Sequence, residues 1–168
     1  EILNGTSVYA IWKRLFDLAA VTLLSPLLFL IAGVVALIVY FDSGAPVLFR
    51  QKRLGRNGVP FTMVKFRTMK QNSEENGAAF ASHGDPRVTK TGQFLRKFRL
   101  DEIPQFWNVL KGDMSIIGPR PEQAGFAREF EEDIPLYALR HNVRPGITGW
   151  AQVMQGYAAT VNETREKL

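Results

Sequence analysis

The chain contains no cysteine and only two histidines, His83 and His141, among its 168 residues. Without cysteine there can be no disulfides, thiolate zinc sites, iron–sulfur clusters or cysteine nucleophiles. Two histidines so far apart in the sequence also argue against a histidine-rich metal site. The candidate chemistry therefore rests on carboxylates and on cationic side chains.

Several common active-site motifs are also missing. The sequence has no G-x-x-x-x-G-K, G-x-G-x-x-G, H-E-x-x-H or G-x-S-x-G, which removes the P-loop, dinucleotide, zincin and hydrolase signatures. It also lacks an Asp-x-Asp pair, which holds a metal in many nucleotide-sugar enzymes. The acidic run Glu131–Asp133 is typical of a solvated helix face.

What is present indicates one folded, basic domain. Apolar residues make up 46% of the chain, and 21 basic against 16 acidic residues give a net charge of +5. A chain of this length buries one core rather than two. The basic excess lies in residues 1–120, whereas residues 121–168 are slightly acidic. A basic front part favours an anionic partner, which could be lipid headgroups, nucleic acid or a phosphorylated substrate.

The range Leu18–Phe41 carries no charged residue and is long enough to cross a bilayer as a helix. Pro26 follows Ser25 inside this run, so the helix should kink there, and Ser25 could bond a carbonyl that the break leaves open. Basic clusters flank the run on both sides, and positive charge marks the cytoplasmic side. A kinked spanning helix and a re-entrant helix both remain open, with the charges slightly favouring the re-entrant one. The flanking cations are Lys13 and Arg14 before the run, and Arg50, Lys52, Arg53 and Arg56 after it.

The rest of the chain predicts a β-hairpin followed by helices. Residues 46–66 have two β-prone runs around Asn57-Gly58, a strong turn signal. Residues 67–85 predict a loop that ends in the turn Asp85-Pro86. Residues 92–113 have helical spacing with a break near Pro104, which suits the first turn of a second helix. Residues 122–139 predict a further amphipathic helix, residues 144–152 an irregular segment, and the tail from Val161 a helix-prone end.

Two features within this region could carry chemistry. Asp101-Glu102 is an acid pair among basic residues, and carboxylates can act as nucleophiles or hold Mg²⁺. An acid pair before a helix proline is also an ordinary helix cap. Arg120 lies between two prolines in Gly-Pro-Arg-Pro, where a rigid backbone would present its guanidinium to a phosphate. The plainer alternative is a loop arginine paired with a neighbouring glutamate.

Together these residues resemble the bacterial sugar transferases called monotopic phosphoglycosyl transferases. The resemblance runs from about Lys13 to Gln152, and five motifs in register carry it. They are Lys-Phe-Arg-Thr-Met (65–69), Leu-Asp-Glu-Ile-Pro-Gln (100–105), Asn-Val-Leu-Lys-Gly-Asp-Met-Ser (108–115), Gly-Pro-Arg-Pro (118–121) and Arg-Pro-Gly-Ile-Thr-Gly-Trp-Ala-Gln (144–152).

The resemblance implies an enzyme and its reaction. Such enzymes transfer a sugar-1-phosphate from a UDP-sugar to polyprenyl (undecaprenyl) phosphate and release UMP, as the first membrane step of exopolysaccharide, capsule, O-antigen or glycoprotein glycan assembly. By resemblance, Asp101 and Glu102 form the catalytic dyad, with Asp101 as nucleophile and ligand of the Mg²⁺ cofactor. The phosphate- and substrate-binding residues that we predict are Arg120, Lys65, Arg67, Arg96 and Gln152.

The resemblance also implies a fold and a location. We expect an α+β, mostly helical fold at the membrane interface, with a re-entrant helix broken at Ser25-Pro26, a β-hairpin and amphipathic surface helices. The predicted segments are an extension (1–12), the re-entrant helix (13–42) and a cytoplasmic catalytic domain (43–168). We expect a piece of a longer protein, because the chain begins with Glu1 and family members continue beyond Leu168. The expected location is the cytoplasmic face of the bacterial inner membrane, with membrane lipid as a partner and a homo-oligomer left open.

One departure from the family pattern leaves the donor sugar open. After Gln152 this chain has Val153-Met154-Gln155-Gly156-Tyr157, where many members have Asn or Ser, Gly and Arg. Two other classes compete with the enzyme. A non-enzymatic membrane module binding anionic lipid would explain the charge but not the acid pair among cations. The long uncharged run argues against a nucleic-acid-binding domain.

Overall fold

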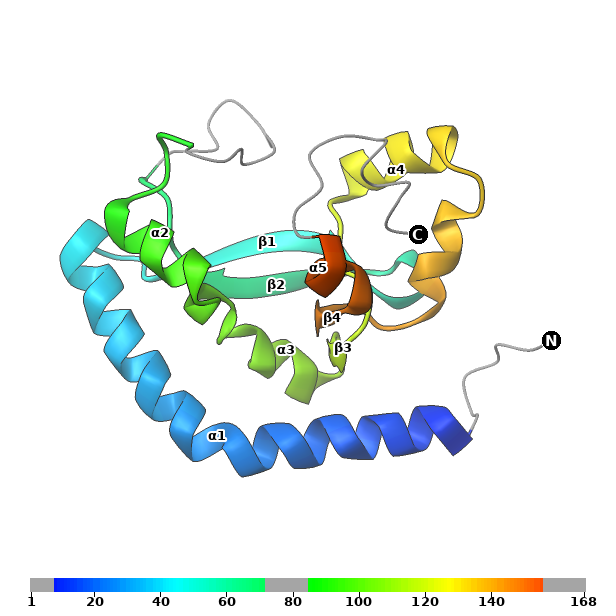
Figure 1. Ribbon diagram of the computed structural model, residues 1–168, viewed down its shortest axis with the longest axis horizontal. Helices are drawn as coiled ribbons and strands as arrows, with labels where there is room; N and C mark the ends of the chain where they lie inside the picture. The colour runs from blue at the N-terminus through cyan, green and yellow to red at the C-terminus, as the bar shows by residue number, and fades with distance from the viewer. Residues whose placement is uncertain (1–7, 72–84, 156–168) are drawn as a thin grey trace.

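The computed structural model describes residues 8–71 and 85–155 (Figure 1). It contains helices, short 3₁₀ turns (η) and two small sheets. In chain order the elements are α1 (Val8–Ser43), β1 (Leu48–Leu54), η1 (Arg56–Gly58), β2 (Pro60–Phe66), α2 (Lys90–Lys97), η2 (Leu100–Glu102), α3 (Gln105–Lys111), β3 (Ser115–Ile117), α4 (Ala124–Asp133), η3 (Tyr137–Asn142), β4 (Gly146–Thr148) and α5 (Trp150–Gln155). The prediction of a mixed helix-and-sheet fold is therefore confirmed. The tail from Val161 and most of the predicted loop lie outside the described residues.

The predicted hairpin is present. Strands β1 and β2 pair antiparallel, from Leu48 opposite Phe66 to Leu54 opposite Pro60. The turn between them uses left-handed backbone at Asn57 (φ 57°) and Gly58 (φ 71°), which is why Asn-Gly suits this position. The turn is longer than a two-residue hairpin loop because η1 is inserted in it.

Helix α1 runs unbroken from Val8 to Ser43 but is bent. Pro26 lies inside it, and Figure 1 shows two arms that meet at an angle partway along the helix. A proline removes one helical hydrogen bond and pushes on the preceding turn, which accounts for the bend. The hydroxyl of Ser25 donates to the carbonyl of Thr22 at 2.8 Å. Among the described residues, α1 is the helix that is long and apolar enough to cross a membrane.

Both arms of α1 pack against β2, the first arm together with α3 and the second together with α2. In the first arm, Val21 joins a core with Met63, Val109 and Met114. In the second arm, Val35 and Val39 pack against Phe66 and Leu95. Between these contacts the helix exposes large apolar side chains, with Leu23 82% and Phe29 75% exposed.

Polar contacts hold both ends of α1 as well. Near its start, Asp17 is buried, pairs with Lys13 at 2.6 Å and accepts a hydrogen bond from the Ser115 hydroxyl at 2.8 Å. At its end, the guanidinium of Arg67 donates to the carbonyls of Ser43 and Gly44. The helix ends are therefore fastened to β3 and to the end of β2.

The helices after the hairpin confirm the break near Pro104. Helix α2 ends at Lys97, η2 carries the acid pair, and Pro104 is the N-cap residue of α3. Gly92 in α2 lies so close to Thr68 that a Cβ there would come within 2.1 Å of the Thr68 carbonyl oxygen. This close approach sets α2 against the end of the hairpin.

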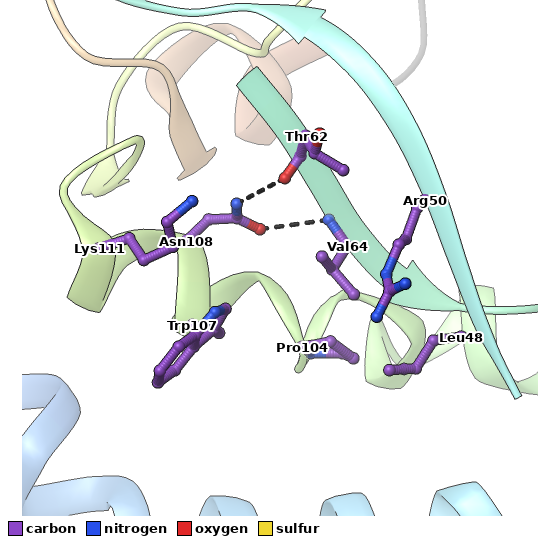
Figure 2. Close-up of a pocket in the computed structure, with 8 residues that line it drawn as sticks. All are labelled: Leu48, Arg50, Thr62, Val64, Pro104, Trp107, Asn108 and Lys111. Carbon is purple, nitrogen blue, oxygen red and sulfur yellow. Dashed lines mark hydrogen bonds between the residues drawn. The ribbon is translucent and has the colours of Figure 1, made fainter.

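Asn108 joins α3 to the edge of β2 (Figure 2). Its side-chain amide donates to the Thr62 carbonyl at 2.8 Å and its carbonyl oxygen accepts from Val64 N–H at 3.2 Å. A pocket of about 390 Å³ opens beside this contact, lined by Leu48, Arg50, Thr62, Val64, Pro104, Trp107, Asn108 and Lys111. Side chains alternate along a strand, so Val64 in this pocket and Lys65 next to it face opposite sides of the hairpin.

Two predictions for the second half of the chain were wrong. The helix predicted for residues 122–139 is only α4, which ends at Asp133 and is followed by the separate turn η3. Pro135 disfavours helical backbone at the preceding residue, and Ile134 is extended (φ −122°, ψ 110°). The segment 144–152 is also not irregular, because β4 pairs in parallel with β3 and α5 follows.

Glycines allow that parallel pair to form. A Cβ on Gly146 would come within 2.1 Å of the Gly118 nitrogen. The Gly118 N–H donates to the Thr148 carbonyl, and the Gly146 N–H donates to the Pro119 carbonyl. The sequence motifs Gly-Pro-Arg-Pro and Arg-Pro-Gly-Ile-Thr-Gly therefore meet in space through backbone contacts.

Candidate active site

The acid pair sits in the short turn η2 between α2 and α3. Asp101 is 7% exposed and Glu102 is 5% exposed. The residue before this turn, Arg99, has left-handed backbone (φ 58°), which is uncommon for a residue other than glycine and costs free energy. The left-handed residue ends α2 and redirects the chain, so that both carboxylates enter the interior instead of continuing a helix face.

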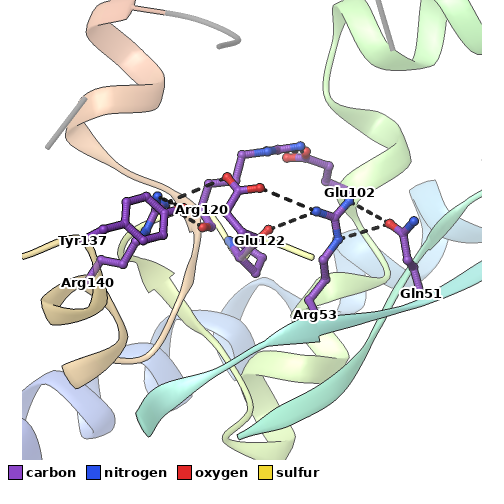
Figure 3. A network of polar contacts seen from close by, with 8 residues as sticks. Gln51, Arg53, Glu102, Arg120, Glu122, Tyr137 and Arg140 are labelled. Carbon is purple, nitrogen blue, oxygen red and sulfur yellow. Dashed lines mark hydrogen bonds and ion pairs between the residues drawn. The ribbon is translucent and has the colours of Figure 1, made fainter. Parts of the chain in front are cut away.

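Glu102 is the carboxylate of the pair that forms ion pairs with arginine side chains. Its Oε1 lies 3.2 Å from Arg120 Nη1, and its Oε2 lies 3.6 Å from Arg99 Nη1. Figure 3 shows Arg120 reaching Glu102 from the loop after β3. The arginine of the Gly-Pro-Arg-Pro motif is therefore beside the acid pair, as the sequence suggested. Its partner Glu102 lies 18 residues earlier in the sequence.

Asp101 is left without such a partner. Within the described residues, its carboxylate has no side-chain hydrogen bond or ion pair. Burial raises the pKa of Asp101, the adjacent Glu102 raises it further, and the cations Lys65 and Arg96 act in the opposite direction. An unpaired carboxylate of this kind, held near cations, can attack an electrophile or hold a metal.

Lys65 and Arg96 reach this carboxylate from two different elements. Burial is the main cause that lowers the pKa of Lys65 to about 8, and Arg96 lowers it further. The Lys65 ammonium also lies 5.2 Å from the centre of the Phe49 ring. Arg96 donates to the Thr68 hydroxyl at 2.9 Å, which fixes its guanidinium beside the hairpin. Both cations therefore lie near the acid pair, and their binding of phosphate stays a prediction.

The other two predicted binding residues are engaged elsewhere. Arg67 is buried, and its guanidinium donates hydrogen bonds to the end of α1. Gln152 lies in α5 and donates to the Ile147 carbonyl at 3.1 Å, while its buried Oε1 accepts no hydrogen bond within the described residues. Their roles toward phosphate or sugar stay predictions, and the structure gives Arg67 a second task in holding α1.

Sequence reasoning missed three cations near the site. Arg99 lies two residues before Asp101 and pairs with Glu102. Arg53 in β1 and Arg140 in η3 both contact the loop that carries Arg120 (Figure 3). No local motif marks Arg53 or Arg140, because both lie in segments remote in sequence from the acid pair.

The donor set fits Mg²⁺ of the kind that serves phosphate chemistry. Among the described residues no group of three or more acidic or histidine side chains could hold a metal by themselves. Mg²⁺ at phosphoryl-transfer sites typically takes one or two carboxylates and completes its shell with substrate phosphate and water. Asp101, unpaired and beside Glu102, is the residue that would hold it.

Comparison with known proteins identifies the family of this chain. The sequence model of the family described as bacterial sugar transferase matches residues 8–168. The chain belongs to this family. That membership confirms the resemblance drawn from the five motifs, all of which lie inside the matched range.

Named relatives within the family differ in the sugar that they carry. The chain is 51% identical to the UDP-N-acetylgalactosamine-undecaprenyl-phosphate N-acetylgalactosaminephosphotransferase of Aeromonas hydrophila, over 96% of this chain and 38% of that protein. It is 45% identical to the UDP-glucose:undecaprenyl-phosphate glucose-1-phosphate transferase of Escherichia coli, over 97% of this chain and 35% of that protein. A Caulobacter vibrioides protein of the same name is 42% identical, over 93% of this chain and 59% of that protein. The chain thus spans between about a third and three fifths of the length of these relatives.

Proposed function

We propose that this sugar transferase moves a sugar-1-phosphate from a UDP-sugar to undecaprenyl phosphate and releases UMP. The observation that carries the proposal is Asp101, a buried carboxylate that has no ion pair with another side chain among the described residues and lies near Lys65, Arg96 and the Arg120–Glu102 pair. The donor and acceptor classes follow the names of the relatives. The reaction would begin a membrane-linked glycan such as an exopolysaccharide, capsule or O-antigen.

The transfer proceeds in two displacements at phosphorus. An oxygen of the Asp101 carboxylate attacks the sugar-bearing phosphorus, the bond from that phosphorus to the bridging oxygen breaks, and UMP leaves with the bridging oxygen. A phosphate oxygen of the acceptor then attacks the same phosphorus, the aspartyl–phosphorus bond breaks, and the carboxylate is regenerated. A covalent intermediate lets two substrates use one small site in turn.

The surrounding charges make this attack feasible. Carboxylate, donor diphosphate and acceptor phosphate are all anionic, so cations must offset their repulsion. Lys65 and Arg96 lie near Asp101 and favour its charged form. Arg120 forms an ion pair with the adjacent Glu102. Mg²⁺, when bound at Asp101, supplies further positive charge on the phosphate oxygens. Glu102 holds Arg120 and Arg99 in position.

The direct test is UMP release from a panel of UDP-sugars. The full-length protein is incubated with undecaprenyl phosphate, Mg²⁺ and each UDP-sugar in turn, and UMP is quantified. We expect release with at least one sugar and none without Mg²⁺. A non-enzymatic lipid-binding module would release no UMP with any sugar, which would overturn the proposal.

We also propose that α1 enters and leaves the same, cytoplasmic, face of the bacterial inner membrane. The support is that both of its arms pack against β2 and the helices beside it, with Asp17 bonded to Ser115 and Ser43 bonded to Arg67. A straight spanning helix would have to pull one of these ends away. The exposed apolar surface around the bend would lie in lipid.

Cysteine accessibility tests this topology cleanly because the native chain has none. Single cysteines at Tyr9 and at Asn57 should react equally with an impermeant thiol reagent applied to the cytoplasmic face. A cysteine at Leu30, which is 68% exposed near the bend, should stay unreactive in the membrane. Opposite accessibility at Tyr9 and Asn57 would mean a spanning helix. Replacing Pro26 with Ala should straighten the helix and favour that outcome.

The lowered pKa of Lys65 predicts a loss of donor affinity in alkali. Because that pKa is about 8, Lys65 loses its positive charge as the pH rises through this value, and the site then attracts the diphosphate less. We expect KM for the UDP-sugar to rise above about pH 8. Lys65→Arg keeps the charge throughout this range, so its KM should stay level. An identical alkaline rise of KM in both proteins would assign the effect to another group.

A further inference from the structure

The loop that carries Arg120 is tied at four consecutive backbone carbonyls. Two of the donors are backbone amides: Gly146 N–H donates to the Pro119 carbonyl and Leu54 N–H to the Glu122 carbonyl, both at 2.8 Å. The two prolines of the motif have no N–H of their own and fix the backbone angle φ. The backbone of residues 119–122 therefore has little conformational freedom at either end.

The two central carbonyls are held by arginine side chains. Arg140 Nη2 donates to the Arg120 carbonyl at 3.0 Å, and Arg53 Nη1 donates to the Pro121 carbonyl at 3.4 Å. The donors come from η3 and from β1, so the loop is fastened between two separate parts of the fold. Figure 3 shows both arginines converging on this loop from opposite sides.

One carboxylate serves as counter-ion to both arginines. Glu122 Oε2 lies 3.8 Å from Arg53 Nη1, and Glu122 Oε1 lies 4.0 Å from Arg140 Nη2. All three side chains are less than a fifth exposed. Two arginines so close together would repel each other in a partly buried site, and Glu122 offsets that repulsion.

The position of Arg140 is defined further by Tyr137. Its Nη1 donates to the Tyr137 hydroxyl at 2.7 Å, and its guanidinium lies 4.7 Å from the centre of the Tyr137 ring. Tyr137 is itself 1% exposed in the core under η3. Burial raises the pKa of Tyr137, so this hydroxyl stays neutral at physiological pH. The Arg140 guanidinium therefore links the buried Tyr137 to the backbone of Arg120.

We propose that Arg140 is a positioning residue for Arg120, with Glu122 as its counter-ion, and that its effect on the reaction passes through Arg120. This inference rests on the proposed function, in which Arg120 neutralises phosphate charge. The side chain of Arg120 can reach Glu102 and a phosphate together only if its backbone is fixed. Small displacements of a charge-stabilising group cost large factors in rate.

A double-mutant cycle separates positioning from general stability. Turnover and KM for the UDP-sugar are measured for wild type, Arg140→Gln, Arg120→Ala and the double variant, with single-turnover UMP release where rates are low. We expect Arg140→Gln to lower kcat by at least about tenfold alone, but by less than about twofold when Arg120 is already alanine. Arg128→Gln, which removes an exposed arginine from α4, is the matched control and should leave kcat unchanged.

Stability is followed in parallel by thermal unfolding. We expect Arg140→Gln to lower the melting temperature equally in both backgrounds, since the contact with Tyr137 does not depend on the Arg120 side chain. Equal rate losses from Arg140→Gln in both backgrounds would overturn the positioning role. If Arg140→Gln does not fold, Arg140→Lys, which keeps the charge but not the fork of donors, is taken through the same cycle with the same criterion. A wild type inactive with every UDP-sugar would instead refute the proposed function.

Discussion

Replacing Asp101 with asparagine should lower turnover by at least about a thousandfold, or ~4 kcal/mol in activation free energy. The amide has nearly the shape of the carboxylate but lacks the charge that attacks phosphorus and that Mg²⁺ prefers. Asp101 is buried, and within the described residues no hydrogen bond or ion pair joins its carboxylate to another side chain, so the substitution should leave the protein folded. UMP release in the steady state measures the effect.

Two variants serve as controls for this result. Asp133→Asn makes the same chemical change at an exposed residue at the end of α4 and should keep wild-type turnover. Glu102→Gln should slow turnover by loosening Arg120 and Arg99, yet keep the nucleophile. It also removes one cause of the raised pKa of Asp101, so the acid limb of its pH profile should move to lower pH. Substantial activity in Asp101→Asn would show that Asp101 is not the nucleophile.

Arg120 should tolerate neither alanine nor lysine. Arg120→Lys keeps the charge, but an ammonium cannot hold the Glu102 carboxylate and a phosphate with the planar fork of a guanidinium. We expect a loss of at least about tenfold in turnover, or ~1.4 kcal/mol. Arg120→Ala should lower turnover by about a hundredfold or more, because it also removes one of the two arginines, Arg99 and Arg120, that pair with buried Glu102.

The measurement for Arg120 is kcat and KM for the UDP-sugar, compared with Arg128→Lys on the exposed face of α4. The loss should lie in kcat, because the contact matters most when charge develops at phosphorus. Near-normal turnover in Arg120→Lys would reduce Arg120 to a general cation. It would also remove the reason for fixing its backbone so firmly.

Local signals in the sequence predicted the parts of the fold that depend on neighbouring residues. Asn57-Gly58 marked the hairpin because left-handed backbone favours those residue types, and Pro104 marked the helix break because proline has no N–H to donate. The end of α4 could have been found in the same way, since Pro135 excludes helical backbone at Ile134. The amphipathic pattern of residues 122–139 continues past Pro135, but the proline ends the helix before it.

Other features depend on contacts between remote segments, and no local pattern predicts them. The strands β3 and β4 are three residues each, too short to show the alternation of apolar and polar residues that marks a strand. They form because Gly118 and Gly146 let the two backbones approach closely. Arg67 looked like a phosphate ligand from its position in a motif, yet its hydrogen bonds serve the end of α1. The positions of Arg53 and Arg140 around the Arg120 loop follow only from the packing of β1 and η3 against it.

The most direct test of the central claim is the mass of the protein after exposure to the donor alone. Wild type is incubated with UDP-sugar and Mg²⁺ without undecaprenyl phosphate, and is then analysed as intact protein and as peptides. We expect a gain of one sugar phosphate, UMP at no more than one equivalent in a burst, and an adduct on the peptide that holds Asp101. Asp101→Asn should gain nothing. Full turnover with both substrates but no adduct from the donor alone, or an adduct on Glu102, would contradict the account and favour a direct transfer within a ternary complex.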